Sequence, residues 1–569
     1  MNSFLIILAV LFLYLLAYHT YGRFLSRRIF KVDPSAHCPS ETLRDGVDFV
    51  PTNKMVLFGH HFTSIAGTGP IVGPAIAIIW GWVPALLWIV FGSIFMGAVH
   101  DFGSMMISLR NDGRSIGDLA GSMLNGRVKA LFMLVIFFTL WIVIAIFGVV
   151  IAKVFSIFPE SVIPVWFQLP IAIWLGFMVY HRGKSPLLFG IIATVLMYAS
   201  MVLGAHFPVL LKGIGSLSPT GIWVVILLVY AYVASILPVT VLLQPRDYIN
   251  AFQLCIAMFL LLLGIAVAHP PMVAPAANLH PSGAPPIFPV IFITIACGAI
   301  SGFHSLVSSG TSSKQCDNEQ SARVISYGGM LLEGVLAAIV LVACGAGLGM
   351  GLQKAGISYS GADAFAQQYA TWGSAAGLGA KIEAFVTGAA NMVATLGIPH
   401  EILVTLLGVF VASFAATTLD TATRIQRYII AEMAQSARFP TLAKKHPATL
   451  IAVLTVLLLA FSSGGGTGAL SLWPLFGALN QMLASLALLV ISIWLMRKGQ
   501  PIRYTALPMA FMLLITAWAM KINLTHFFAQ KNILLFLIGL LISILQFWMV
   551  IEGVVFMIHQ KRVTASSQS

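Results

Sequence analysis

Long runs of apolar residues, separated by short polar segments, dominate the pattern along the chain. A run of about 17 or more mainly apolar residues is long enough to cross a bilayer as a helix. Fifteen such segments are predicted, at residues 3–22, 55–79, 82–109, 128–152, 162–181, 185–204, 219–242, 246–267, 288–312, 323–350, 400–420, 447–463, 470–495, 505–521 and 532–558. The pattern therefore predicts an all-α polytopic membrane protein with about 15 transmembrane helices.

One of these segments departs from the pattern of an ordinary spanning helix. Residues 58–74, F-G-H-H-F-T-S-I-A-G-T-G-P-I-V-G-P, contain four glycines, two prolines and two adjacent histidines. Prolines remove backbone donors and glycines leave the backbone free to unwind. Unwound backbone at membrane depth is tolerated only where protein or a water-filled cavity covers it, and it is typical of transporter binding sites. The segment therefore predicts a broken helix at a binding site.

Composition and charge agree with a membrane protein. The 569 residues are 59% hydrophobic and only 9% charged, and the mean hydropathy is +0.95, far outside the range of soluble proteins. The net charge of +13 does not indicate nucleic acid, because 25 of the 31 lysines and arginines fall on one predicted side. Under the positive-inside rule, the N-terminus is outside and the C-terminus cytoplasmic. The five cysteines lack C-x-x-C spacing and predict neither disulfides nor a metal site.

Two long connections are predicted on the outer side. Residues 268–287 contain six prolines and no Asp, Glu, Lys or Arg, which favours an extended cap. Residues 351–399 contain amphipathic pieces at 361–372 and 381–396, which predict short helices at the outer mouth. The sequence leaves open whether either connection is a lid or a packed plug.

Six motifs resemble those of the carbon starvation protein A family, and the resemblance runs over most of the chain. They are G-H-H-F-T-S-I-A-G-T-G-P-I-V-G-P (59–74), H-D-F (100–102), L-P-V-T-V-L-L-Q-P-R-D-Y (237–248), S-G-F-H-S-L-V-S-S-G-T-S-S-K-Q (301–315), T-T-L-D-T-A-T-R (417–424) and W-P-L-F-G-A-L-N-Q-M-L-A (473–484). The resemblance implies a secondary transporter of the bacterial inner membrane that imports peptides during carbon starvation or, in some members, pyruvate with protons. Its implied partners are a small-molecule substrate and the lipid bilayer, without a cofactor or nucleic acid. The oligomeric state is left open.

The resemblance also implies kinship with the amino acid, polyamine and organocation transporters, whose core is an inverted five-helix repeat of the leucine-transporter type. Counted from 55–79, the sixth core span is 219–242, and Pro238 and Pro245 interrupt its cytoplasmic end. Matching breaks in two halves are expected of such repeats. The predicted organisation is a first span and cytoplasmic loop at 1–54, core spans one to seven at 55–267, the outer loop 268–287, core spans eight to ten with the outer segment at 288–430, and additional spans at 431–569.

The predicted substrate site consists of Ser64, Gly67, Thr68 and Gly69. The three residues 67–69 lie roughly 18 Å into their span at a rise of about 1.5 Å per residue. Backbone amides freed by the break would bind a substrate carboxylate, whereas a small-residue helix crossing is the alternative. The expected substrate is therefore a small carboxylate, either pyruvate or a short peptide.

Two coupling ions are considered. Five buried ionisable residues fall roughly 8 to 14 Å below the cytoplasmic edge by the same arithmetic, namely His60, His61, His100, Asp101 and His304. They predict a proton relay in which Asp101 orients one histidine and His61 or His304 carries the proton; neutral histidines bonded to backbone carbonyls are the alternative. The hydroxyls of Ser308, Ser309 and Thr311 are a possible sodium site, as related folds imply, or helix-end caps.

Other polar residues in the spans have structural interpretations. Asp420 and Arg424 are spaced i, i+4 and predict an ion pair, in preference to a gating role. Glu333 is either a proton carrier or a protonated, hydrogen-bonded side chain. Asn480 and Gln481 are predicted to form interhelical hydrogen bonds. The sequence has no repeated filter element, H-E-x-x-H motif or P-loop, which disfavours a channel, an intramembrane metalloenzyme and direct ATP coupling.

Overall fold

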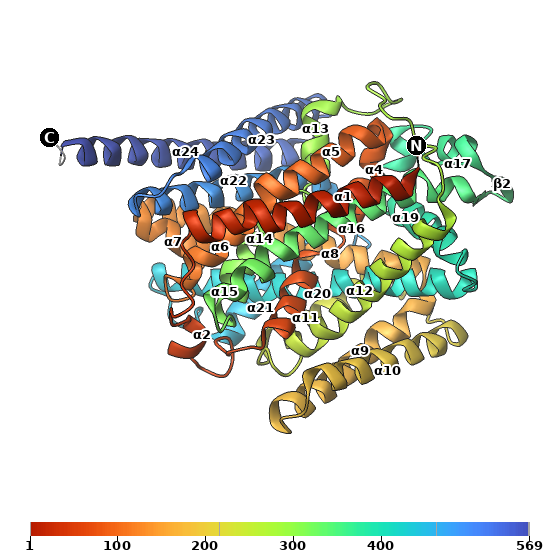
Figure 1. The fold of residues 1–569 in the computed structure, drawn as a ribbon, viewed down its shortest axis with the longest axis horizontal. Coiled ribbons are helices and arrows are strands. Elements are labelled where there is room, and N and C mark those ends of the chain that lie inside the picture. The colour runs from red at the N-terminus through yellow and green to blue at the C-terminus, as the bar shows by residue number, and fades with distance from the viewer. Residues whose placement is uncertain (1, 216, 463, 567–569) are drawn as a thin grey trace.

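The computed structural model describes residues 2–215, 217–462 and 464–566, which form a bundle of helices. Figure 1 shows that most helices run along one common direction, with α2 (Pro39–Thr42), α7 (Ile116–Met123) and α15 (Glu319–Ala322) at one end and the N-terminus and β2 (Ile357–Tyr359) at the other. The first end carries the lysine- and arginine-rich loops 23–54, 110–129 and 314–323 and is called the basic end. The second is called the opposite end.

Twelve helices within the described residues are long and apolar enough to cross a membrane. They are Ser3–Ile29 (beginning with α1, Ser3–Ala17), Trp82–Leu109 (α5, Trp82–Gly92, and α6, Ala98–Leu109), Gly126–Ile157 (α8), Pro159–His181 (containing α9, Val162–Gly176), Pro186–His206 (α10), Pro219–Ile236 (α11), Leu243–Ala268 (α12), Glu319–Met350 (α15 and α16, Gly329–Gly345), His400–Ser436 (α20), Gly468–Arg497 (containing α22, Trp473–Arg497), Arg503–Ala529 (α23) and Ile533–Ile558 (within α24, Ile533–Ser566). The protein is therefore a multi-pass membrane protein.

The predicted count of fifteen spans is not confirmed. Within the described ranges, α3 (Lys54–Ile65) and α4 (Gly69–Ala77) form a pair bent by 43°, which raises the count to thirteen if it crosses as one span. The predicted span 288–312 consists of α13 (Ile287–Thr294) and α14 (Gly302–Gly310), separated by non-helical residues 295–301. The predicted span 447–463 is α21 (Lys445–Ala460), a helix of 16 residues.

The break between α3 and α4 lies where glycine and proline predict it. Pro70 occupies the first turn of α4, where its missing amide hydrogen costs nothing. A Cβ atom at Gly69 would lie 2.3 Å from the sulfur of Cys297, and one at Gly73 would lie 2.6 Å from the carbonyl oxygen of Thr294. The absence of side chains therefore allows α4 to pack directly on the segment that joins α13 to α14.

The prediction of a second broken helix near residues 237–245 is wrong. α11 ends at Ile236 and α12 begins at Leu243, so the prolines separate two helices and do not interrupt one. The α conformation is disfavoured before Pro238, whereas Pro245 is tolerated in the first turn of α12. The second interrupted segment is the α13–α14 pair. There the Phe303 amide donates a 3.0 Å hydrogen bond to Asn480 Oδ1, at the start of α14.

Short elements cover the opposite end, as predicted. α17 (Gly361–Gln368), α18 (Trp372–Ala375) and α19 (Leu378–Ala394) confirm the amphipathic helices, and β1 (Leu352–Lys354) pairs antiparallel with β2, with Leu352 opposite Tyr359. The predicted cap is irregular between residues 269 and 286. Backbone hydrogen bonds of 2.8 Å, from Asn278 to Trp80 and from Val273 to Gly345, fix it to the bundle.

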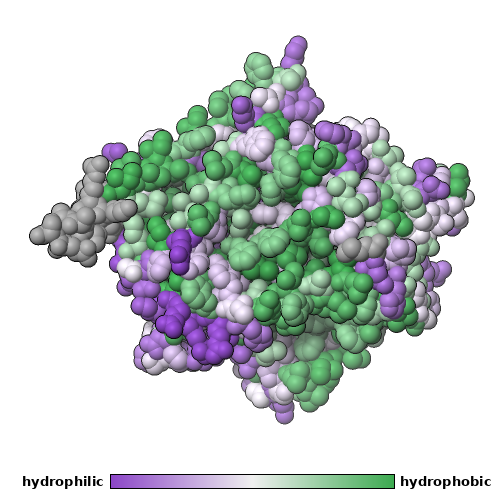
Figure 2. All heavy atoms as spheres, turned by 45° about the horizontal axis from the view of Figure 1, so that its top comes forward, coloured by the Kyte–Doolittle hydropathy of each residue, from purple (hydrophilic) through white to green (hydrophobic). Residues whose placement is uncertain are grey.

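One hairpin lies at the edge of the bundle. Figure 1 shows α9 and α10 beside α12, away from the remaining helices, and the two pack mainly on each other and on α12. Figure 2 shows a broad apolar band across the face it displays and a dense hydrophilic group at the lower left. An apolar band of this kind matches the hydrocarbon layer of a bilayer.

Candidate functional site

A cavity of about 780 Å³ lies between the two helix breaks and the opposite end of the bundle. Its lining includes Thr68 and Gly69 at the first break and Cys297 at the second. From there the lining extends to Gly283 and His526, which are exposed, so the cavity reaches the surface at the opposite end. The volume falls within the usual range of small-molecule sites.

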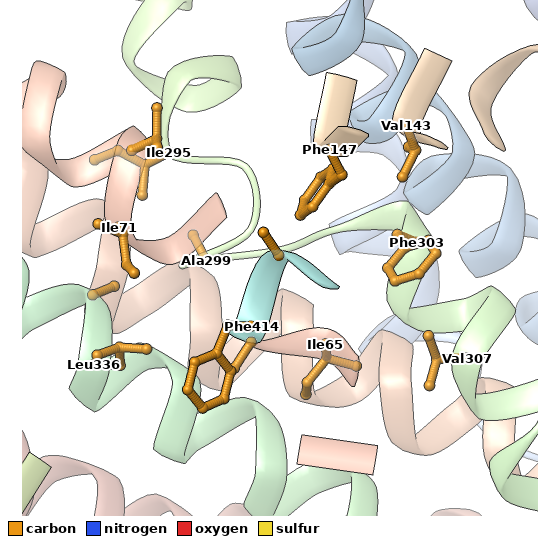
Figure 3. Close-up of a cluster of buried hydrophobic side chains, with 14 of the residues drawn as sticks. Ile65, Ile71, Val143, Phe147, Ile295, Ala299, Phe303, Val307, Leu336 and Phe414 are labelled. Atoms are coloured by element: carbon orange, nitrogen blue, oxygen red, sulfur yellow. The ribbon is translucent and has the colours of Figure 1, made fainter. Parts of the chain in front are cut away.

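Apolar side chains from several helices meet around the breaks. Figure 3 shows Ile65 and Ile71, on either side of the first break, near Ile295, Ala299 and Phe303 of the second. Side chains from α8, α16 and α20 complete the cluster. These residues pack around the unwound segments, and their close van der Waals contacts stabilise this arrangement.

The structure divides the predicted substrate residues into two groups. Thr68 and Gly69 line the cavity, and their amides donate no backbone hydrogen bond to any described residue. Gly67 and Ser64 lie outside the lining. A Cβ atom at Gly67 would meet Thr418, and the Ser64 hydroxyl lies 3.2 Å from that of Thr421. Two of the four predicted residues therefore face the space that a substrate can enter.

His61 lies at the centre of a buried polar network that joins α3, α6 and α14. Its Nε2 lies 3.0 Å from Asp101 Oδ2, and its Nδ1 lies 2.8 Å from Ser312 Oγ. The Ser308 hydroxyl donates a hydrogen bond to the other oxygen of Asp101. All four side chains are fully buried. The orientation of one histidine by Asp101, which the proton-relay hypothesis requires, is present in this network.

The other three predicted histidines do not share this carboxylate. His60 Nδ1 lies 2.6 Å from Asp247 Oδ2 on α12. His304 Nε2 lies 3.3 Å from Glu333 Oε2 on α16, at ion-pair distance but without hydrogen-bond geometry. Neither ring nitrogen of His100 has a hydrogen-bond partner among the described residues. The depths calculated from the sequence placed all these side chains in one layer. In the structure, His60, His61 and His304 each lie beside a different acidic residue.

The three hydroxyl groups of the possible sodium site form hydrogen bonds within the protein. Ser309 Oγ donates to the Ser305 carbonyl at 2.6 Å, and Thr311 Oγ1 donates to the Val307 carbonyl at 3.0 Å. Ser308 bonds to Asp101, as described above. Helical serines and threonines commonly bond in this way to the carbonyl four residues earlier.

The predicted ion pair between Asp420 and Arg424 is wrong. Asp420 instead forms an ion pair with Arg246 of α12 and accepts a 2.6 Å hydrogen bond from the Tyr230 hydroxyl. Arg424 lies 2.8 Å from Asp48 of the loop before α3. Since a buried charge needs a partner and further hydrogen bonds, each side chain is paired with a neighbouring element and not with its own helix.

These ion pairs join α12, α20 and the loop before α3 at the basic end. Arg424 also donates to the carbonyl oxygens of Ala234 and Leu237, at the end of α11. Arg110 lies 2.8 Å from Glu319. Sequence reasoning missed Arg246 and Asp247, although two adjacent charges at the start of a long apolar run were an available signal.

The predicted interhelical hydrogen bonds of α22 are confirmed. Asn480 Nδ2 donates to Ser301 Oγ at 3.0 Å, and Gln481 Nε2 donates to the Phe292 carbonyl at 3.1 Å. Both residues therefore hold the interrupted α13–α14 segment from outside the cavity.

In sequence, the chain is similar to proteins that are named transporters. A family model described as "Carbon starvation protein CstA" matches residues 2–519. The "Peptide transporter CstA" of Campylobacter jejuni is 34% identical, over 91% of this chain and 80% of its own. The "Pyruvate/proton symporter BtsT" of Escherichia coli is 33% identical, over 91% of this chain and 81% of its own. A solved manganese transporter of Eremococcus coleocola is 13% identical, with a TM-score of 0.43, over 90% of this chain and 99% of its own.

Proposed function

The chain belongs to the carbon starvation protein CstA family and is a secondary transporter, and from that premise we propose that it imports a small carboxylate nutrient with protons across the bacterial inner membrane. The observation that carries the proposal is the cavity at two touching helix breaks, which reaches the surface at one end of the bundle while buried ion pairs close the other. Transporters bind substrate at such breaks and expose the site to one side at a time.

The proposed fold core is an inverted repeat of five helices that omits the α9–α10 hairpin. The first repeat then consists of α3–α4, α5–α6, α8, α11 and α12, and the second consists of α13–α14, α15–α16, α20, α21 and α22. Each repeat begins with an interrupted helix. If the α9–α10 hairpin were counted in the core, the second interrupted helix would be core span eight. Without the hairpin it is core span six, the first helix of the second repeat, which supports the inverted repeat better.

The basic end is proposed to face the cytoplasm. The excess of lysine and arginine there supports this orientation, with the N-terminus outside. The cavity then opens outward, and the pairs Arg246–Asp420 and Arg424–Asp48 are proposed as inner gate contacts. Import would require both pairs to separate when the cavity closes on the outer side.

His61 is the proposed proton carrier. Its Nε2–H donates to Asp101, and its Nδ1 faces the Ser312 hydroxyl, which can donate to the neutral ring or accept from the protonated ring. Both protonation states of His61 therefore keep two hydrogen bonds. His304 beside Glu333 is the second proposed proton site.

The test is uptake of pyruvate and of dialanine by proteoliposomes. We expect accumulation above equilibrium when the outside is acidic, without sodium, and loss of accumulation on addition of an uncoupler. Accumulation that requires sodium and survives the uncoupler would instead indicate a sodium symporter. Equilibration without accumulation under either gradient would indicate a passive channel, and chemical conversion of the solute would indicate an enzyme.

A further inference from the structure

Lys381 is the only lysine, arginine, aspartate or glutamate among the described residues that line the cavity. It lies on α19, outside the helices long enough to span the membrane, and only 5% of its surface is exposed. Its ammonium lies 5.0 Å from the centre of the Trp473 ring. Within the described chain, no acidic side chain forms an ion pair with it. The cavity therefore has one buried, unpaired cation in its wall.

A buried ammonium without a carboxylate partner is costly, and the contact with the Trp473 ring offsets only part of that cost. Burial lowers the pKa of Lys381 from its ordinary value to about 8, so most of the side chains are still protonated at neutral pH. A lysine with a purely structural role would be expected to have an acidic partner. Among the described residues Lys381 has none, and the space beside it is a cavity large enough for an anion.

The rest of the cavity lining also favours a negatively charged ligand. The cavity contains the N-terminal residue of α4, Gly69, and the dipole of this nine-residue helix favours negative charge there. α19 packs against α4, so Lys381 and the end of α4 belong to one wall. Among the described residues no carboxylate lines the cavity, and a substrate ammonium group would therefore find no opposite charge from them.

We propose that Lys381 binds the substrate carboxylate in this cavity, beside the ring of Trp473, and that the site selects small anions that lack an ammonium group. The inference rests on the proposed function, because it names the residue and the substrate class of the same site. It favours a monocarboxylate such as pyruvate over a zwitterionic peptide.

The first experiment measures equilibrium binding of pyruvate, pyruvamide and dialanine to the purified full-length protein. The variant Lys381→Met removes the charge and keeps most of the apolar stem, and Lys381→Arg keeps the charge. The matched control is Lys354→Met, since Lys354 is exposed, lies outside the cavity and donates to the Gln367 carbonyl at 2.9 Å. Thermal unfolding of each variant reports whether it folds.

We expect Lys381→Met to weaken pyruvate binding by roughly tenfold to a hundredfold, the value of a charge-assisted hydrogen bond. Lys381→Arg should retain most of the affinity, and Lys354→Met all of it. Neutral pyruvamide should bind equally to the wild type and Lys381→Met. Unchanged pyruvate affinity in a folded Lys381→Met variant would overturn the role of Lys381, while uptake by the wild type would leave the proposed function standing.

A second measurement needs no variant. Cys297 is half-buried and lines the cavity, whereas Cys255 is exposed and lies outside it, so the two cysteines provide a probe and an internal control. We expect pyruvate to slow alkylation of Cys297 but not of Cys255, and dialanine to protect less at equal concentration. Absence of protection would remove the substrate from this cavity, and stronger protection by dialanine would overturn the anion selectivity. If the wild type neither binds nor transports either solute, the proposed function and this inference are both wrong.

Discussion

His61 and Asp101 form a fully buried hydrogen-bonded pair between α3 and α6, with 3.0 Å between His61 Nε2 and Asp101 Oδ2. The two residues are 40 positions apart in the chain, and neither belongs to the lining of the cavity. A carboxylate in this position accepts a hydrogen bond from the imidazole. The pair therefore provides a direct test of how proton entry is linked to transport.

Replacing Asp101 with asparagine should uncouple transport from the proton gradient. The charge-assisted hydrogen bond that His61 would lose is worth about 1.5–3 kcal/mol, a factor of roughly ten or more. We expect proton-driven accumulation of substrate to fall by a similar factor, whereas exchange of labelled for unlabelled substrate at equal pH persists. Asp363→Asn, at an exposed position on α17, is the control. Full accumulation by Asp101→Asn would exclude this pair from coupling.

Replacing Gly69 with leucine should abolish uptake without preventing membrane insertion. Even the Cβ atom would collide with Cys297, and the larger side chain fills the cavity floor and favours continued helix. The smaller change Gly69→Ala should also impair uptake, and Cys297→Gly in the same chain should restore part of it. Gly126→Leu is the control, because a Cβ atom there meets no atom within 4 Å. Normal uptake by Gly69→Leu would show that the break is not the binding site.

Replacing Asp420 with asparagine should destabilise the protein, because Arg246 loses its main buried partner. Breaking one side of a buried ion pair costs about 3–5 kcal/mol, whereas removal of both charges costs much less. We therefore expect a clear fall in the thermal unfolding midpoint for Asp420→Asn and substantial recovery in Asp420→Asn with Arg246→Met. The measurement is unfolding in detergent, with Asp363→Asn alongside. Equal stability of the single variant and the wild type would mean that Asp420 is not a required partner.

Pyruvate binding should weaken as the pH rises through about 8. Burial lowers the pKa of Lys381 to about 8, and its protonated form is the one that attracts a carboxylate. The affinity should therefore be fully present below that pH and decline above it. Lys381→Arg should remove the decline, because a guanidinium stays charged. Equilibrium binding between pH 6.5 and about 9.5, without a membrane gradient, separates this effect from coupling. A decline that persists in Lys381→Arg would come from another group.

The sequence predicted where the twelve long apolar helices of the described chain lie, because apolar runs and prolines act locally. The first break was predictable from Gly67, Gly69 and Pro70. The second was not, since residues 295–301 contain no proline and unwind through contacts with other helices, such as the Asn480 bond to Phe303. Likewise, partners such as Asp420 and Arg246, 174 positions apart, are brought together only by packing.

The backbone contact between α4 and the α13–α14 connection has a mechanical consequence. A Cβ atom placed on Gly73 of α4 would lie only 2.6 Å from the carbonyl oxygen of Thr294 of α13. The two half-helices are therefore packed so closely that one cannot move without the other. They would turn as a single lever, and the hinges must lie where each connects to a complete helix. α4 packs on α16 and α19, and α13 packs on α23, so these are the surfaces that would slip during each cycle.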